Sequence, residues 1–244
     1  MQKFFRISYF IRLLVIFGLG YGIVSFVPLF SLGKIPSVAN PLNGLILFVF
    51  LSGFLINQTM SRNKTLHVSI TLELSRTRRI MHLIENIEAN ARWKKEVKKS
   101  LIAYLQSIGA HDFATYHTSD ASFRDLTHEI YTFVPKTKKD EMLYEELLFI
   151  TREIAFQRQE LTHGLSSPIS PYTWIVFCLV GVIAIVLILL IRDESLLAMW
   201  YVFFVTVIIF LIADLLIELN VLTKSKRRAY QKMYVENSKR IAKE

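Results

Sequence analysis

The sequence predicts an all-α integral membrane protein with four transmembrane helices and a helical cytoplasmic domain. The chain of 244 residues is 52% hydrophobic, which is more apolar than is usual for a soluble domain of this size. It contains four apolar segments of about 20 residues, the length that a helix needs to cross the hydrocarbon core of a bilayer. The long stretch between the second and third segments has helical periodicity and no run of alternating β-branched residues.

The predicted spans are separated by one long cytoplasmic segment and two short loops. The first three lack Lys, Arg, Asp and Glu, and the fourth contains only Asp214 near its end. The loop "RDES" is so short that the last two spans must form a hairpin. A secretory signal peptide is the alternative for residues 1–32, but the apolar run is long and lacks a small-residue cleavage site, which favours a retained anchor. The four spans cover residues 13–32, 41–60, 172–191 and 196–217.

Basic residues set the predicted orientation. Three Lys or Arg precede the first span, sixteen lie between Ser61 and Leu161, and eight follow Glu218, whereas the two outer loops hold only Lys34 and Arg192. The positive-inside rule places the basic side in the cytoplasm. We therefore expect a multi-pass protein of the cell membrane with both termini in the cytoplasm.

This topology divides the chain into four parts. The N-terminal membrane hairpin and the C-terminal membrane hairpin flank a cytoplasmic helical domain, and a basic cytoplasmic tail follows. The expected boundaries are 1–60, 61–168, 169–218 and 219–244, in the order N-terminal hairpin, cytoplasmic domain, C-terminal hairpin and tail.

Amphipathic periodicity predicts several helices in the cytoplasmic domain. Apolar residues recur at helical spacing from Leu72 to Ile87, and further helices are expected over the ranges given below. "SDASF" supplies a helix start, with Ser119 or Asp120 as the cap, and Pro135 separates the last two helices. The stretch "GAHDFATYHTSDAS" is expected to be a loop. The ranges are 98–108, 122–133 and 139–159.

The charge distribution points to a membrane surface as partner. The stretch from Ser61 to Leu161 nearly balances its sixteen basic residues with fourteen acidic ones, so the net charge of +9 comes mostly from the tail. A basic segment directly after a span commonly contacts anionic lipid head groups. No nucleic-acid-binding module accompanies it, so we expect no nucleic-acid partner.

No enzyme motif is present, and neither catalysis nor a cofactor is expected. Five residues offer zinc ligands in principle, but they contain no His pair at i,i+4 and fall largely in the expected loop. They are His111, Asp112, His117, His128 and Glu129. We therefore expect no metal site. Asp214 and Glu218 share a helix face near the cytoplasmic end of a span, where a functional and a structural role are both open. The single cysteine, Cys178, is expected to be a small buried residue.

The second span carries a stripe of large apolar residues at four-residue spacing, Ile46, Phe50 and Phe54. Such residues share one helix face and lie about 6 Å apart along the axis. In a ring of helices they would form three apolar collars, and apolar constrictions control ions by dewetting. The alternative is that they face lipid or pack against other helices.

The passage "SGFLINQTMSRNKTLHVSITLELSR" resembles the pore helix of bestrophin channels. Gly53, Phe54, Asn57 and Arg62 match that family's pattern. The resemblance implies a hydrophobic neck formed by Ile46, Phe50 and Phe54.

A second passage, "SSPISPYTW", is similar to the Pro-Ile-Pro entry to the third span of bestrophins. It implies that Ile169 forms the cytosolic aperture. "REIAFQRQEL" followed by Trp174 resembles a bacterial branch of the family whose function is uncharacterised. The Arg-Trp-Trp that follows the bestrophin pore helix is Arg62-Asn63-Lys64 here, and "IELNVLTK" replaces the family's acidic run, so no calcium site is implied.

The resemblance implies a homo-oligomeric ion channel, as a pentamer in the lipid bilayer, that conducts small inorganic ions. Chloride is the first expectation, although the nearly neutral cytoplasmic segment does not decide between anions and cations. The alternative is a non-conducting membrane-anchored helical scaffold or signalling protein that binds a cytoplasmic partner.

Overall fold

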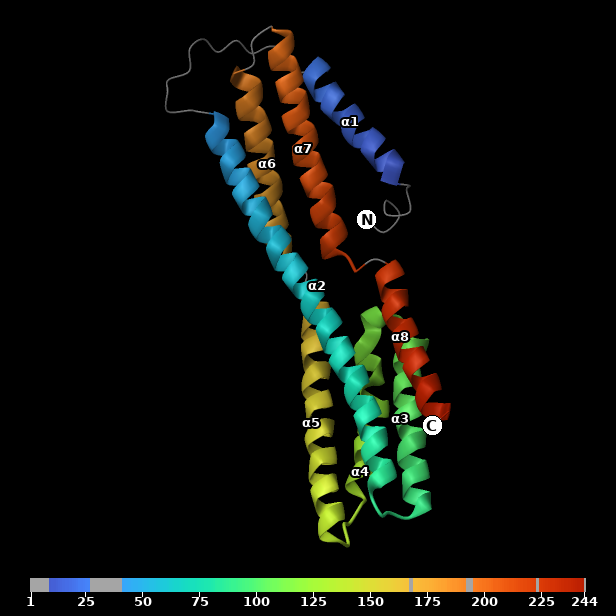
Figure 1. Cartoon of the computed structure of the whole chain (residues 1–244). Coiled ribbons are helices and arrows are strands. Elements are labelled where there is room, and N and C mark those ends of the chain that lie inside the picture. Colours follow the sequence, from blue (N-terminus) through green and yellow to red (C-terminus); the bar gives the residue numbers. More distant parts are fainter. Residues whose placement is uncertain (1–8, 27–40, 167–168, 192–194, 223, 244) are drawn as a thin grey trace. The chain divides into compact units, whose positions relative to one another are not determined.

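The computed structural model describes residues 9–26, 41–166, 169–191, 195–222 and 224–243. Every regular element in these ranges is helical, which confirms the all-α prediction (Figure 1). The elements are α1 (Tyr9–Phe26), α2 (Pro41–Asn86), α3 (Ala91–Ala110), the 3₁₀ helix η2 (Phe113–Ser119), α4 (Asp120–Tyr131), α5 (Lys138–Ser166), α6 (Pro171–Ile191), α7 (Leu196–Asn220) and α8 (Lys224–Lys243).

Residues 1–60 and 169–221 form one compact unit, which we call the membrane unit. It contains α1, the first part of α2, α6 and α7. Phe48 and Leu55 of α2 pack in its core with Phe177 and Ala184 of α6 and Val205 of α7. The packed helices are strongly apolar on their outer faces as well, as expected for helices surrounded by lipid.

The described residues contain three helical stretches that are long and apolar enough to cross a bilayer, starting at Gly44, Pro171 and Leu196. α1 contributes a shorter apolar helix, and the first predicted span continues to residue 32, outside the described residues. The number of four spans therefore stays a prediction. Lys34, Arg192 and Pro168 also lie outside the described residues.

α2 is a single helix of 46 residues. The predicted span over 41–60 and the helical pattern that begins at Leu72 are both parts of this one helix. The physical reason is that neither Gly nor Pro occurs between Gly53 and the end of the helix at Asn86. Its start at Pro41, a residue favoured in the first helical turn, agrees with the sequence.

Residues 61–168 and 222–244 form the second compact unit, which we call the cytoplasmic unit after the location that the sequence predicts for it. α3 packs along α8 and α4, and the buried residues include Ile84, Leu101, Leu126, Ile154 and Tyr234. The tail, which was predicted only as a basic segment, is the helix α8 of this unit.

The segment expected to be a loop is largely the 3₁₀ helix η2. Phe113 and Tyr116 are buried in the core of the cytoplasmic unit, which fixes the segment. Thr115 and Ser119 donate hydroxyl hydrogen bonds to the carbonyl three residues earlier. Ser119 therefore occupies the cap position of α4 without capping it through its side chain.

Candidate functional site

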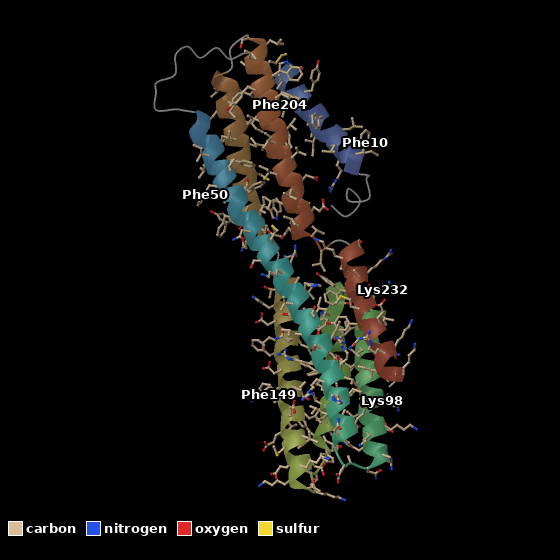
Figure 2. All side chains as sticks on the ribbon, in the orientation of Figure 1. Phe10, Phe50, Lys98, Phe149, Phe204 and Lys232 are labelled. Atoms are coloured by element: carbon tan, nitrogen blue, oxygen red, sulfur yellow. The ribbon has the colours of Figure 1, made fainter. Side chains whose placement is uncertain are left out.

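The outer face of α2 in the membrane unit carries the predicted apolar stripe. Ile46, Phe50 and Phe54 are 64%, 76% and 61% exposed in the single subunit, and Phe50 projects outward from the helix (Figure 2). Asn57, three residues after Phe54, is also exposed and extends the same face. Among the described residues, no other part of the subunit covers these side chains, which leaves them open to lipid, an ion path or another copy.

The opposite face of α2 is packed. Phe48 is buried, and its ring centroid lies 5.1 Å from that of Phe177 on α6. Ser52 and Thr59 lie on this buried face, and each hydroxyl donates to the carbonyl four residues earlier at 2.6 Å. α2 thus packs one face against the other helices of its own subunit and exposes the opposite face.

The other residues of the predicted pore-helix motif, Gly53 and Arg62, differ in exposure. Gly53 is exposed, and a Cβ there would have no neighbour within 4 Å. Its small size therefore leaves open space beside the stripe. Arg62 is partly buried.

Ile169, the predicted aperture residue, lies just before α6 and outside regular helix. Its backbone N–H donates to Asn220 Oδ1 at 3.1 Å, and its half-buried side chain packs against the core of the membrane unit. Ser170 caps α6 by accepting a hydrogen bond from the N–H of Thr173, and Pro171 begins the helix, as the sequence indicates.

Asp214 and Glu218 of α7 are joined by a partner that sequence reasoning missed. Arg12 of α1 is nearly buried, and its Nη2 lies 3.2 Å from Asp214 Oδ2 and 3.0 Å from Glu218 Oε2. An ion pair inside an apolar unit neutralises charges that would be costly there alone. The sequence signal for this pairing was the presence of an Arg in the first apolar helix and of two acidic residues in the last apolar helix.

The cytoplasmic unit contains a buried cluster around Glu73 of α2. Its carboxylate accepts hydrogen bonds from three tyrosine hydroxyls: Tyr116 Oη lies 2.8 Å from both oxygens, Tyr234 Oη lies 2.5 Å from Oε2, and Tyr104 Oη also donates. The three tyrosines come from η2, α8 and α3. One carboxylate therefore joins four elements.

Arg158 of α5 forms the second layer of this cluster. Its Nη1 donates to Tyr104 Oη at 2.7 Å, and its Nη2 donates to Ser119 Oγ at 3.0 Å and pairs with Asp120. The guanidinium also lies over the ring of Phe123, 5.0 Å from the centroid. The cluster compensates its buried charges internally, as buried polar groups must.

Burial dominates the electrostatics of this cluster. It raises the pKa of Glu73 above the ordinary value, although the tyrosine hydrogen bonds and Arg158 act in the opposite direction. Burial, together with the nearby Glu73 carboxylate, also raises the pKa of the Tyr104 and Tyr234 hydroxyls. The tyrosines therefore remain hydrogen-bond donors.

The His-rich region forms other contacts. Asp112 pairs with Arg227 at 2.6 Å, and the His111 ring lies 2.9 Å from the carbonyl of Ser107. In the part of the chain that the structure describes, no group of three or more His, Cys, Asp or Glu side chains is arranged to hold a metal ion. Cys178 is exposed on α6, which corrects the expectation that it is buried.

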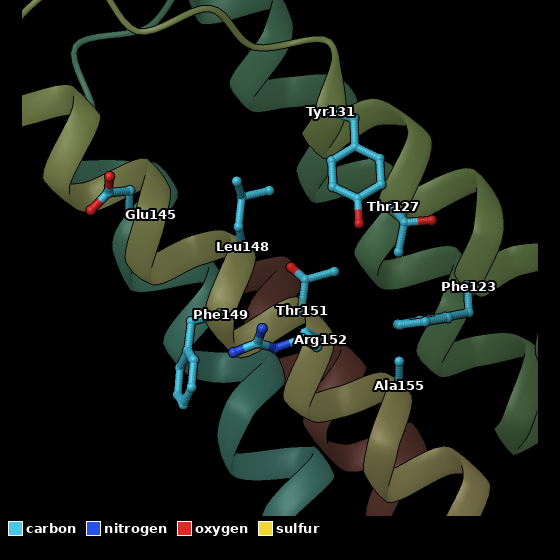
Figure 3. Close-up of a pocket in the computed structure, with 9 residues that line it drawn as sticks. All are labelled: Phe123, Thr127, Tyr131, Glu145, Leu148, Phe149, Thr151, Arg152 and Ala155. Atoms are coloured by element: carbon cyan, nitrogen blue, oxygen red, sulfur yellow. The ribbon is translucent and has the colours of Figure 1, made fainter.

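An open groove runs between α4 and α5 in the cytoplasmic unit, with a cavity volume of about 550 Å³. Phe123, Thr127 and Tyr131 of α4 face α5 across it (Figure 3). Phe149 and Arg152 of α5 also line it, and the Arg152 guanidinium carbon lies 5.4 Å from the Phe149 ring centroid (Figure 3). Sequence reasoning gave no sign of this groove.

Comparison with solved structures identifies the same fold. A crystal structure of a membrane protein matches with a TM-score of 0.74 at 14% identity, covering 97% of this chain and 98% of that chain. A bacterial bestrophin homologue from Klebsiella pneumoniae matches through several variants. One has a TM-score of 0.74 at 14% identity, covering 96% of this chain and 99% of that chain. Another has a TM-score of 0.70 at 14% identity, covering 97% and 99%.

The apolar helices and these neighbours define a helical membrane protein. The bestrophin-like domain family matches residues 37–220. The chain therefore belongs to the bestrophin-like family, as the residues of its second span indicate. No curated protein sequence gives a significant match.

Proposed function

We propose that the protein is a homo-oligomeric ion channel of the cell membrane that conducts small anions such as chloride. The second span would line the path, and Ile46, Phe50 and Phe54 would form its hydrophobic neck. The observation that carries the proposal is that this stripe is exposed in the subunit whereas the other face of α2 is packed. Membership of the bestrophin-like family supports the same function.

The chemistry of the stripe fits an ion gate. Copies of α2 around an axis would stack three apolar collars about 6 Å apart. Water leaves such a constriction readily, which blocks ions until it widens. Phenylalanine ring edges carry partial positive charge and suit a passing anion.

The remaining assignments follow the family resemblance. We propose a pentamer, with ions leaving past Ile169 at the cytosolic end, and Gly53, Asn57 and Arg62 as the exit of the pore helix. Both termini and the domain over residues 61–168 would be cytoplasmic, between membrane hairpins over 1–60 and 169–218 and before the tail over 219–244. The basic residues of the short flanks support this orientation.

The test is ion flux in liposomes that contain Phe50→Ala or Phe54→Ala protein. Each truncation should widen the neck and raise basal chloride flux at matched protein incorporation. The matched control is Phe204→Ala on α7, which removes a ring that is 53% exposed but lies on another helix. Equal flux from the Phe50 and Phe204 variants would contradict the neck.

Phe48 is unsuitable as the control, although it lies nearly opposite Phe50 on the helix. It is buried against Phe177, and its truncation should cost roughly 3–5 kcal/mol of stability. A lower yield of assembled Phe48→Ala protein would therefore report on packing.

A non-conducting scaffold is the second candidate function. The open groove between α4 and α5 favours it, because an exposed groove of this kind can seat a partner helix. Folded, oligomeric protein that gives no ion flux above empty liposomes, in the wild type and in both neck variants, would favour the scaffold over the channel.

A further inference from the structure

The charges of the cytoplasmic unit are segregated between two pairs of helices. α3 contains five Lys or Arg residues and one acidic residue, and α8 contains eight and one. α4 and α5 show the opposite bias, with one basic and three acidic residues in α4 and four basic and six acidic residues in α5. α3 and α8 therefore form a strongly basic part of the unit.

Exposed cations form one stripe on each of the two basic helices. Arg92, Lys95 and Lys99 recur at spacings of three and four residues on α3, and cations recur at spacings of four and seven residues on α8. At about 100° per residue, each stripe lies opposite the buried face of its helix, which carries Leu101 on α3 and Tyr234 on α8. The stripe on α8 consists of Arg228, Lys232, Lys239 and Lys243.

α3 and α8 pack side by side and run antiparallel. A Cβ at Gly109 would contact Val235, and Asp112 pairs with Arg227 at 2.6 Å, so higher residue numbers on α3 match lower numbers on α8. In rotation about each helix axis, Gly109 and Val235 fall between the buried face and the basic stripe. Both stripes therefore flank the α3–α8 contact on the side of the unit away from its core.

The two stripes join end to end into one basic band. The antiparallel register, continued along both helices, places Lys99 within about one helical turn of the height of Lys243. Arg92 then lies at one end of the band and Arg228 at the other, about 30 Å apart along the helix axes. Lys232, within the band, projects outward from α8 in Figure 2.

Most of the band has no acidic partner within the subunit. Lys99 pairs with Glu96 at 3.8 Å and Lys232 with Glu236 at 3.6 Å, and both are exposed contacts between neighbouring turns of one helix. Exposed pairs of this kind are weak. The other five cations of the band form no ion pair with any residue that the structure describes: Arg92, Lys95, Arg228, Lys239 and Lys243.

The surface around the band distinguishes between anionic partners. In the described part of the chain, α3 and α8 expose no large apolar or aromatic side chain. A helix that lies in a membrane interface buries an apolar face there, and single-stranded nucleic acid stacks its bases on exposed aromatic rings. Carboxylates need neither feature. Alternate side chains of an extended polypeptide are about 6.6 Å apart, which is close to the rise of about 6 Å between cations four residues apart on a helix.

We propose that the basic band of α3 and α8 binds an extended acidic segment of a partner polypeptide. About ten residues would follow the band from Arg92 to Arg228, with Glu or Asp at alternate positions facing the cations. Charge complementarity supplies the attraction and selects the partner. The inference concerns the outer surface of the cytoplasmic unit and does not depend on ion conduction.

The experiment measures binding of a fluorescein-labelled deca-glutamate peptide by fluorescence anisotropy. The full-length protein is held in nanodiscs of neutral phosphatidylcholine. The test variant, Lys95→Glu/Lys239→Glu/Lys243→Glu, reverses three exposed cations of the band. Its Kd for the peptide should be at least about tenfold higher than that of the wild type, and binding to the wild type should weaken as salt is raised. A deca-glutamine peptide should not bind.

The matched control is Arg124→Glu/Lys136→Glu/Lys138→Glu, which changes the net charge equally but reverses exposed cations outside α3 and α8. Its Kd should stay within about twofold of the wild-type value, as should that of a variant with Arg at the three tested band positions. Equal weakening by both reversal variants, or no peptide binding by the wild type, would overturn the proposal. Displacement of the peptide by phosphatidylserine vesicles or oligo-dT at a lower concentration of negative charge would also overturn it, because the occupant would then be a membrane or a nucleic acid.

Discussion

Replacing Arg158 by Met should destabilise the cytoplasmic unit strongly. Arg158 is buried, donates to Tyr104, Tyr116 and Ser119, and interacts electrostatically with the Glu73 carboxylate. Met keeps much of the apolar length of the side chain but has no donor and no charge. Removing one partner of a buried charge pair costs about 3–5 kcal/mol, because the other charge remains buried and uncompensated.

Arg79→Met is the matched control. Arg79 donates to Glu146 at 2.7 Å, but both side chains of this pair are more than 40% exposed. Exposed pairs contribute about 0–1 kcal/mol. The same substitution at two ion pairs within one unit therefore isolates the effect of burial. At roughly 3 °C per kcal/mol, Arg158→Met should lower the Tm by about 10–15 °C and Arg79→Met by no more than about 3 °C.

The assay is thermal unfolding in detergent followed by the fluorescence of Trp93. This indole lies in the cytoplasmic unit, 4.7 Å from the ring of Phe133, and donates to the carbonyl of Glu129. Trp174 and Trp200 lie in the membrane unit, and replacing both with Phe leaves one reporter. Melting of Arg158→Met within about 3 °C of Arg79→Met would refute the reasoning. A Glu73→Gln/Arg158→Met double variant should lose less than the sum of its single variants, because the two residues share one cluster.

Three further predictions concern pH, topology and the exit. Because burial raises the pKa of Glu73 above its ordinary value of 4.5, the folded chain binds this proton more tightly than the unfolded chain. The stability of the wild type relative to Glu73→Gln should therefore be highest below pH 4.5 and fall as the pH rises. A wild-type Tm that rises relative to the Tm of Glu73→Gln between about pH 4 and 7 would contradict the assignment. Cysteines at the exposed positions Thr115 and Lys232 should react with an impermeant thiol reagent only after permeabilisation, and labelling of sealed cells would reverse the topology. Ile169→Ala should change the conductance or the ion selectivity in bilayer recordings, whereas loss of folded protein alone would make Ile169 a packing residue.

Helix positions were predictable because they depend on local patterns. Pro41 starts α2, Pro171 starts α6, and charges between apolar residues indicate the cytoplasmic helices. The predicted helix over 139–159 lies inside α5. It was predictable because its apolar residues recur at helical spacing, which a single sequence shows. α2 continues beyond the predicted end of the span at Met60, because a change from apolar to polar residues changes the surroundings of a helix without breaking its hydrogen bonds.

The buried cluster could not be predicted because its members are distant in sequence. Tyr104, Tyr116 and Tyr234 are 31, 43 and 161 residues from Glu73. Each is an ordinary residue of an amphipathic helix, and a tyrosine there is equally compatible with an exposed hydroxyl. Only the packing of α8 on α3 brings the third tyrosine to the carboxylate.

The sequence of the second span contains some information about which face of α2 is packed. Apolar character cannot separate the two faces, because Phe48 is as hydrophobic as Phe50. The hydroxyl residues can: Ser52 and Thr59 fall on the face of Phe48 and Leu55, and small hydroxyl residues mark helix contacts in membranes. On α6 the corresponding sign is Gly181, where a Cβ would lie 3.2 Å from the Phe48 ring. The packed face of α2 can thus be inferred from its hydroxyls, and the stripe of Ile46, Phe50 and Phe54 is then the exposed face that the proposed ion path would use.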